Sequence, residues 1–401
     1  MERSFHEEIR SLGLGEGETF HGEGILAVTK ALLQSGVAYV GGYQGAPVSH
    51  LLDVMVQARE LLDGLGVHVE ACTNEASAAA MLGASINYPL RGAVTWKSIV
   101  GTNVASDALS NLASAGVVGG ALIVIGEDYG EGASVIQERT HAFAMKSAMC
   151  LLDPRPTLAN IVRMVEQGFE LSEASSMPVM LDLRIRACHV QGSFVARANR
   201  APPISRRNLL SAAAPFNYDR LSHPPSTFMH EKLKVEVRIP AARRFIVERG
   251  LNERFEGTPG DPAAELGIIV QGGLHNNLVR ALAQAGLADA FGATRIPMLV
   301  LNVVYPLVPD EIRDFCAGKR AVLVVEEGQP EFIEQEIATH LRRGELATRL
   351  HGKDVLPMAG EYTTEAMLRG LLAFLAAEAP ALGEGPGAAA LERMRRLREE
   401  A

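Results

Sequence analysis

The chain has 401 residues, and at the usual ~150 residues per domain this length predicts two or three domains. Hydrophobic residues make up 47% and charged residues 21% of the chain, which is typical of folded globular proteins and excludes disordered and collagen-like chains. The 38 Lys and Arg residues against 47 Asp and Glu residues give a net charge of −9, so we expect no nucleic-acid binding, because such binding depends on neutralising phosphates.

Residues 22–193 alternate helical periodicity with short apolar segments. Helices are predicted at 24–36, 50–66, 74–89 and 158–175, and strands at 37–43, 67–72, 93–96, 121–128 and 178–184. Buried-type strands that alternate with helices indicate a parallel sheet covered on both faces. We therefore expect a first α/β domain over residues 1–195.

The stretch 196–263 differs in composition. It is rich in Pro, Arg, Ser and Asn, and only part of 229–257 has helical character. We interpret it as an interdomain connector, which is either an arm that wraps a partner or the second domain, or a solvated linker.

A second α/β domain is predicted at 264–380. Its strands are expected at 265–274, 298–307 and 321–328, and its helices at 275–292, 309–318 and 331–344. Residues 381–401 form a charged tail. The predicted fold class is therefore α/β, with two parallel-sheet α/β domains.

Several kinds of site are excluded by missing motifs. The four cysteines, at 72, 150, 188 and 316, contain no C-x-x-C pair, so we expect no metal site in this chain and assign any iron–sulfur cluster to another chain. Neither a secretory leader nor an apolar run of ~20 residues is present, which predicts a cytoplasmic protein that does not bind membranes. G-x-S-x-G, H-E-x-x-H and Walker motifs are also missing.

Two Gly-rich turns, at 40–47 and 270–277, follow predicted strands. Such turns bring backbone N–H groups close to a ligand at the carboxyl edge of a sheet, although they also occur as plain tight turns. Glu75 lies in the first turn of a helix whose other residues are mostly Ala, Gly and Ser. It is either a functional acid in a narrow cleft or a partner of the helix dipole.

Longer motifs resemble one family. In the first domain they are GGYQGAPVSH (41–50), NEASAAAMLGAS (74–85), VTWKSIVGTNVASDAL (94–109) and FELSEASSMPVMLDLRIRACH (169–189). These runs resemble the pyrimidine-binding domain of thiamine-diphosphate-dependent 2-oxoacid:ferredoxin oxidoreductases, and most closely the alpha (large) subunit of indolepyruvate ferredoxin oxidoreductase. In the second domain, YPLVPDEIRDF, KRAVLVVEEGQPEFIEQEI and GKDVLPMAGEYT are similar to the transketolase C-terminal-like domain of that subunit.

The resemblance implies roles for particular residues. Glu75 matches the catalytic glutamate that bonds N1′ of the aminopyrimidine and helps to generate the ylid that attacks a 2-oxoacid. The loop 43–47 matches a Tyr-Pro-x-Thr-Pro loop, so Gln44 and Gly45 are expected to bind cofactor. The stretch 94–103 matches one that lines the cleft in family members, so the same is expected of Asn103. Substrate contacts are expected for Ala46, Lys97 and Arg139. The charged residues Lys97 and Arg139 could instead form surface or interface salt bridges.

Ala46 stands where the family has threonine, and Gln44 where it has proline. The loss of a hydroxyl and a methyl group opens space, which favours a bulky, aromatic 2-oxoacid over pyruvate. The same departures from the family leave a non-catalytic scaffold subunit as an alternative. A non-oxidative thiamine diphosphate decarboxylase subunit is the other alternative.

The family's Gly-Asp-Gly…Asn magnesium motif and its C-P-G-C-P-H-R motif do not occur in the 401 residues. We therefore expect thiamine diphosphate to be shared with a partner subunit that carries the diphosphate-binding domain, Mg²⁺ and [4Fe-4S] clusters. The resemblance further implies a gamma-type subunit, ferredoxin or another electron acceptor, and coenzyme A. The particular 2-oxoacid, the acceptor and the stoichiometry stay open, as does whether the chain is a natural split subunit.

Overall fold

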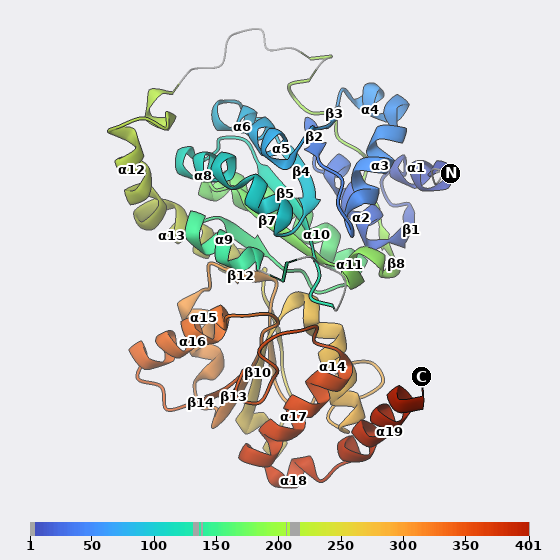
Figure 1. Cartoon of the computed structure of the whole chain (residues 1–401), viewed down its shortest axis with the longest axis vertical. Helices are drawn as coiled ribbons and strands as arrows, with labels where there is room; N and C mark the ends of the chain where they lie inside the picture. Colours follow the sequence, from blue (N-terminus) through green and yellow to red (C-terminus); the bar gives the residue numbers. More distant parts are fainter. Residues whose placement is uncertain (1–4, 131–135, 138, 206, 209–216, 401) are drawn as a thin grey trace. The chain divides into compact units, whose positions relative to one another are not determined.

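The computed structural model describes residues 5–130, 136–137, 139–205, 207–208 and 217–400 (Figure 1). They fall into two compact units. The first unit contains the residues up to 128 together with 139–249, and the second contains the residues from 250 onward together with a short segment after 128. Each unit holds a largely parallel sheet with helices around it, so the predicted α/β class with two parallel-sheet domains is confirmed.

The first unit contains a parallel sheet whose strands carry long apolar runs. In spatial order its strands are β6 (Cys150–Leu152), β7 (Val179–Arg184), β5 (Ala121–Glu127), β4 (Gly92–Lys97), β2 (Tyr39–Gly42) and β3 (His68–Ala71). Every residue of β5 and β7 is buried, as expected for central strands covered on both faces. An antiparallel ribbon of β1 (Thr19–Glu23) and β8 (Gln191–Val195) completes the unit.

Helices cover both faces of this sheet (Figure 1). One face carries α5 (Glu75–Met81), α8 (Ser106–Ala115) and α9 (Thr140–Ser147), and the other carries α2 (Gly24–Gln34), α3 (Ser49–Gln57) and α10 (Leu158–Ser175). The shorter helices are α1 (His6–Leu12), α4 (Arg59–Leu65), α6 (Ala84–Asn87), α7 (Val100–Val104) and α11 (Ile185–His189). This arrangement places the carboxyl ends of β2, β4 and β5 side by side at one edge.

A buried lysine ties the start of the chain to the residues after β8. Lys30, in α2, donates to the carbonyls of Leu12 and Leu14 at 3.2 and 2.5 Å and to Oδ1 of Asn199 at 2.7 Å. Burial lowers the pKa of Lys30 to about 8, although the charge of Glu18 partly offsets this effect. The ammonium therefore joins three segments that are distant in sequence.

Residues after 217 form a nearly continuous helical segment. It consists of the 3₁₀ turn η1 (Tyr218–Arg220), α12 (Ser226–Leu233), the π-helical turn η2 (Lys234–Arg238) and α13 (Ile239–Glu248), which packs against α10. Arg238 donates to the carbonyls of Ala113, Ser114 and Ala115 at 3.0–3.1 Å. Its guanidinium thereby satisfies the last carbonyls of α8, which lack partners within the helix.

The second unit has a sheet in the order β14 (Arg349–His351), β13 (Ala321–Val325), β10 (Leu266–Gln271), β11 (Met298–Leu301) and β9 (Glu253–Phe255), with β9 antiparallel. Two helices, α14 (His275–Gln284) and α17 (Thr364–Glu378), lie on one face, and α15 (Pro309–Cys316) and α16 (Phe332–Arg343) lie on the other (Figure 1). The remaining elements are η3 (Pro262–Glu265), η4 (Gly272–Leu274), β12 (Val303–Tyr305), α18 (Pro380–Gly383) and α19 (Gly387–Glu400).

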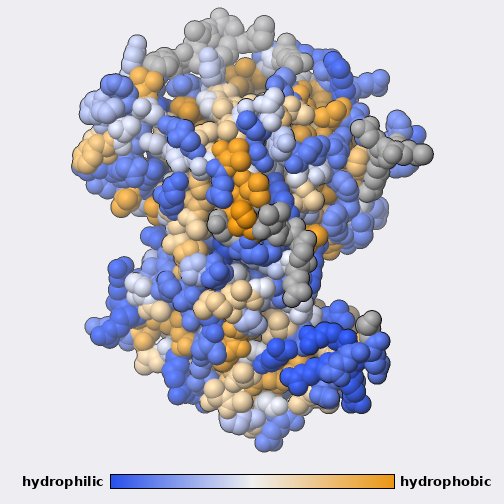
Figure 2. Space-filling view, viewed as in Figure 1, coloured by the Kyte–Doolittle hydropathy of each residue, from blue (hydrophilic) through white to orange (hydrophobic). Residues whose placement is uncertain are grey.

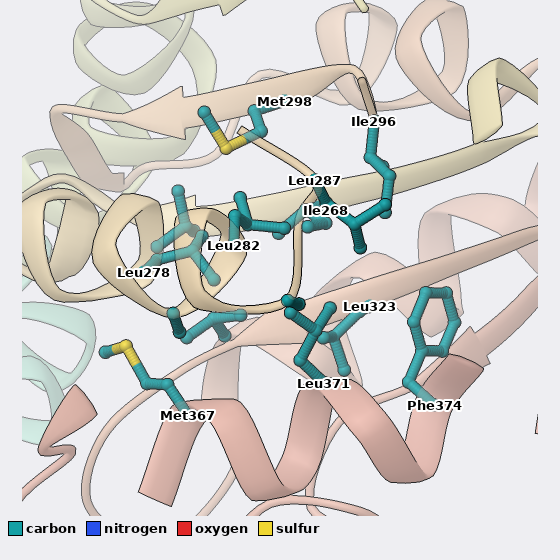
Figure 3. Packing of buried hydrophobic residues seen from close by; sticks show 14 of the residues in the cluster. Ile268, Leu278, Leu282, Leu287, Ile296, Met298, Leu323, Met367, Leu371 and Phe374 are labelled. Carbon is teal, nitrogen blue, oxygen red and sulfur yellow. The ribbon is translucent and has the colours of Figure 1, made fainter. Parts of the chain in front are cut away.

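The core of the second unit lies between its sheet and the helices α14 and α17. Figure 3 shows Leu278 and Leu282 of α14 and Leu371 of α17 gathered against Ile268 and Leu323 of the sheet. All five side chains are buried, and burial of each contributes about 1.5–3 kcal/mol. This packing explains why the two helices pair closely.

Several predicted elements are shorter or divided in the structure, among them the helix predicted at 74–89, which forms the two short helices α5 and α6. The helix predicted at 50–66 divides at Ala58 into α3 and α4. The helix predicted at 275–292 ends at Gln284, because Gly286 adopts a left-handed φ of 74° that a helix cannot continue. The strand predicted at 298–307 is interrupted at Asn302, whose buried amide donates to the Leu251 carbonyl at 2.9 Å.

Candidate functional site

Glu75 begins α5, directly after the carboxyl edge of the first sheet. Asn74 caps this helix, because its Oδ1 accepts the Ser77 N–H at 2.8 Å. Glu75 is only 7% exposed, and the described residues make no hydrogen bond or ion pair to its carboxylate. Its carboxylate oxygens are not among the fully buried polar atoms that lack a partner, so they stay accessible at the sheet edge to a group from outside these residues.

Gly101, in α7, packs closely against the Glu75 side chain. A Cβ atom at Gly101 would lie 3.0 Å from Cγ of Glu75 and 2.5 Å from Cδ1 of Trp96. Any residue larger than glycine would therefore displace one of these side chains. Trp96 is fixed in turn, since its indole N–H donates to Oγ1 of Thr102 at 3.2 Å.

The loop after β2 approaches the end of β4 closely. A Cβ atom at Gly45 would lie 2.6 Å from Cβ of Lys97, so this position requires glycine. Gln44 is exposed and donates to Oδ1 of Asp53 at 2.6 Å, and Ala46 is also exposed. The structure thus brings Gly45 to Lys97 but gives the Gln44 amide a partner on α3.

Lys97 lies at the end of β4 and donates to Oδ2 of Asp128 at 2.9 Å. Its ammonium therefore already has a carboxylate partner. Asn103 lies on α7 and is exposed. Lys97 ends β4 and Asn103 lies on the helix that follows it, and of the two only Lys97 is held by an ion pair.

Arg139 precedes α9 and is 3% exposed. His141 lies two residues later, and burial together with the charge of Arg139 lowers its pKa well below its usual range. His141 is therefore neutral at physiological pH. Arg139 supplies a buried positive charge at the amino end of α9.

A group of buried acids at the ends of β5, β6 and β7 was not predicted from the sequence. Oε1 of Glu127 accepts the Ser98 hydroxyl at 2.9 Å and the Thr140 N–H at 2.8 Å. Burial and the neighbouring Glu127 and Asp153 raise the pKa of Asp182 well above its usual range, and Asp182 also shares a hydrogen bond with Glu127.

Glu127 therefore joins the loop after β4 to the start of α9, which are the two segments that carry Lys97 and Arg139. Asp153 in turn accepts from Nη2 of Arg184 at 2.9 Å. The signal that could have revealed this group is an acid at the end of, or inside, an otherwise apolar strand, as in IGED (125–128) and LDLR (181–184).

The Gly-rich turn of the second unit has a structural use. Oε1 of Gln271 accepts the Glu327 N–H at 2.8 Å, so this side chain joins the ends of β10 and β13.

Across the described ranges there is no group of three or more His, Cys, Asp or Glu side chains suited to a metal ion. None of the helices in those ranges is long and apolar enough to cross a bilayer.

The chain is similar to proteins of known function. Residues 258–356 match the family model of the indolepyruvate ferredoxin oxidoreductase middle domain. The indolepyruvate oxidoreductase subunit IorA of Methanothermobacter thermautotrophicus is 28% identical over 369 residues, which are 90% of this chain and 55% of that protein. IorA of Thermococcus kodakarensis is 28% identical over 366 residues, 88% of this chain and 52% of that protein. The chain thus spans little more than half the length of these relatives.

Two solved structures share the fold. The 2-oxoglutarate:ferredoxin oxidoreductase from Magnetococcus marinus aligns with a TM-score of 0.61 at 16% identity, covering 88% of this chain and 64% of that one. A split gene transketolase, solved as an inactive β4 tetramer, aligns with a TM-score of 0.53 at 13% identity, covering 88% of this chain and 99% of that one.

Proposed function

Because the chain belongs to the indolepyruvate oxidoreductase family as an IorA-like subunit, we propose that it supplies the pyrimidine-binding side of a thiamine diphosphate site. The complete enzyme would oxidise an aryl 2-oxoacid such as indolepyruvate. The observation that carries the proposal is Glu75, which lies largely buried at the start of α5 while its accessible carboxylate has no hydrogen-bond partner among the described residues. Thiamine diphosphate fits this position because its aminopyrimidine offers a ring nitrogen that can share a proton with a carboxyl group.

Each residue at the edge then has a defined task. Bound thiamine diphosphate supplies a nucleophilic carbon for the keto group and an electron sink for decarboxylation. Glu75 would hold the pyrimidine nitrogen through its carboxyl oxygen and could accept or return a proton there. Gly101 packs so closely against Trp96 and Glu75 that an added Cβ atom would lie 2.5 and 3.0 Å from them, and this packing would hold the Glu75 side chain in place beside a bound ring.

The substrate would meet the loop after β2 and the start of α9. The buried charge of Arg139 would stabilise the carboxylate of a 2-oxoacid. Lys97 adds less charge because Asp128 neutralises it at 2.9 Å. Ala46 has a short side chain and is exposed, so the loop leaves space for an aromatic group. Backbone groups near Gly45, and the side chains of Gln44 and Asn103, would complete the cofactor contacts.

The remaining parts of the reaction would come from other chains. We assign the diphosphate site with Mg²⁺ and the [4Fe-4S] clusters to a partner subunit, and a further role to a gamma-type subunit. Electrons would pass through the clusters to ferredoxin or another acceptor, while coenzyme A would take the acyl group. If the product were instead an aldehyde and no electrons were released, the non-oxidative decarboxylase alternative would hold.

The test compares Glu75→Gln with Glu70→Gln in the complex reconstituted with a chain that carries the diphosphate and cluster motifs. Gln is nearly isosteric with Glu but cannot exchange the proton, so indolepyruvate-dependent reduction of a viologen dye should fall by ~10²–10⁴-fold in Glu75→Gln. Glu70, an exposed acid on β3, serves as the matched control and should retain wild-type activity. Unchanged activity and cofactor affinity in Glu75→Gln would support the scaffold alternative.

Parallel assays with phenylpyruvate, phenylglyoxylate and pyruvate measure substrate preference. The proposal expects higher catalytic efficiency with the aryl acids. Pyruvate as the best substrate would contradict the assigned substrate class while leaving the role of Glu75 intact.

A further inference from the structure

Lys97 and Asp128 form an ion pair beside the loop that the proposed function assigns to the substrate. Nζ of Lys97 donates to Oδ2 of Asp128 at 2.9 Å. The Asp128 side chain is 4% exposed and the Lys97 side chain 21% exposed, so the carboxylate is shielded from water while the lysine stays partly accessible. A carboxylate held this close offsets much of the positive charge that the ammonium would present to a ligand.

Two close contacts bring the loop 43–47 to this pair. A Cβ atom at Gly45 would lie 2.6 Å from Cβ of Lys97, and one at Gly126 would lie 2.6 Å from Cδ of Pro47. Lys97 is the last residue of β4, and Gly126 lies near the end of β5. The loop therefore packs against the ends of both strands that carry the ion pair.

The pair is also joined to the segment of Arg139, which we assign to the carboxylate of the 2-oxoacid. Oγ of Ser98 lies 2.8 Å from Oγ1 of Thr140, and Lys97 and Arg139 each come one residue earlier in the chain. Glu127 accepts a hydrogen bond from each of these two segments. The segments that carry the two cationic residues are therefore held together.

Apolar residues follow Lys97 along the chain. The helix α7 begins three residues after Lys97, and its Val100 and Val104 are exposed. Figure 2 shows apolar side chains gathered on this face of the first unit, between α5 and α9. An aryl group is a better neighbour for such a surface than a carboxylate, because a charged group beside apolar side chains loses part of its hydration.

We propose that Asp128 is a specificity-determining residue, which excludes 2-oxoacids that carry a second carboxylate. By pairing with Lys97, Asp128 offsets the positive charge that a second carboxylate would need, and its own negative charge repels that group. An aryl 2-oxoacid has a single carboxylate and avoids this repulsion. Specificity of this kind depends on a repulsive element as well as on attractive contacts. The inference rests on the proposed function, because it concerns which 2-oxoacids that site accepts.

The test compares Asp128→Asn with the wild type in the complex reconstituted with a chain that carries the diphosphate and cluster motifs. Asn keeps a neutral acceptor for the Lys97 ammonium but removes the negative charge. The catalytic efficiency with 2-oxoglutarate relative to that with phenylpyruvate should therefore rise about tenfold or more. Asp63→Asn is the matched control and should leave this ratio unchanged, since Asp63 is exposed on α4.

Two further variants test the role of the cation. Lys97→Gln leaves Asp128 charged, so the efficiency ratio should fall below the wild-type value, and the inhibition constant of 2-oxoglutarate against phenylpyruvate should rise. In the double variant, Lys97→Gln with Asp128→Asn, the gain with 2-oxoglutarate should disappear, because the ammonium that would bind the second carboxylate is gone. An ion pair with a purely structural role would instead lower the efficiency with both substrates alike.

Several outcomes would overturn the inference while leaving the proposed function standing. They are an unchanged ratio in Asp128→Asn, an equal rise in the double variant, and a wild-type complex that prefers 2-oxoglutarate to phenylpyruvate. If Asp128→Asn does not assemble, a ratio that does not fall in Lys97→Gln overturns the inference. A wild-type complex that turns over no 2-oxoacid would overturn the proposed function and the inference together.

Discussion

Glu127 offers a quantitative test of the buried acidic group. Its Oε1 accepts two hydrogen bonds, from the Ser98 hydroxyl and the Thr140 N–H. In Glu127→Ala the Ser98 hydroxyl keeps its contact with Oγ1 of Thr140 at 2.8 Å, but the buried Thr140 N–H loses its acceptor. A buried unsatisfied donor costs about 1–3 kcal/mol, and the cavity left by the side chain raises the expected loss of unfolding free energy to about 2–5 kcal/mol.

Glu127→Gln should be much milder. The amide oxygen still accepts both hydrogen bonds, and the amide N–H can donate to Asp182. We expect a loss below about 1 kcal/mol near neutral pH. The pair of variants therefore separates the hydrogen bonds of Glu127 from its charge.

The two variants should also differ in their pH dependence. Because the pKa of Asp182 is raised in the folded state, folding favours its protonated form, and stability declines as pH rises from the unfolded pKa toward the folded one. Glu127→Gln removes a neighbouring negative charge and lowers the pKa of Asp182. The decline should therefore be smaller in this variant than in the wild type.

The assay is urea denaturation at about pH 5 and about pH 8, followed by fluorescence of Trp96. This is the single tryptophan of the chain, and it is buried in β4 of the first unit, so its signal reports on that unit. Equal losses in Glu127→Ala and Glu127→Gln would refute the reasoning, as would a loss below about 1 kcal/mol in Glu127→Ala.

Two further predictions concern other features. Gly101→Ala should lower thiamine-dependent activity in the reconstituted complex, because the new methyl group meets Trp96 and Glu75. Gly64→Ala is the control and should behave as wild type, because no atom lies within 4 Å of the added carbon. Equal effects of the two substitutions on activity would contradict the packing argument. The other prediction concerns His351 in the second unit, which bonds Asp354 at 2.7 Å and Glu378 at 3.0 Å. Burial lowers the pKa of His351, but the two carboxylates raise it by more, so the net shift is upward. Its contribution to stability is therefore complete below the unfolded pKa and is lost as pH rises through the folded pKa, so thermal unfolding of His351→Gln should depend less on pH above about 6.5 than that of the wild type.

The sequence pattern located most elements because local signals were strong. The helix predicted at 158–175 coincides with α10, whose apolar residues keep one period throughout and which ends where Ser176 adopts a left-handed conformation. In contrast, β6 has only three residues, too few for an alternating or apolar pattern to stand out. Its place in the sheet depends on pairing with β7, which no local pattern encodes.

In the candidate site, too, the sequence predicts which residues lie near one another but not which side chains pair. Sequence motifs predict that Glu75, Gly45 and Lys97 lie at one edge, and the structure places Gly45 and Glu75 after β2 and β3 and Lys97 at the last position of β4. Their roles stay predictions. The pairing of Gln44 with Asp53 and of Lys97 with Asp128 depends on side-chain geometry across different elements. No sequence pattern predicts the role of Glu127, because it bonds Ser98 and Thr140, which come together only in the folded chain.

The hydrogen bond between Lys30 and Asn199 sets the earliest point in synthesis at which the first unit can complete its fold. Lys30 and Asn199 are 169 residues apart, and β1 pairs with β8 over a similar separation. At roughly 5–20 residues per second, a ribosome needs about 10–30 s to make the intervening chain. Throughout that interval β1 has no strand partner and the Lys30 ammonium lacks one of its three acceptors. The nascent chain therefore carries an unpaired strand and an incompletely bonded lysine that are completed only after β8 and Asn199 leave the ribosome.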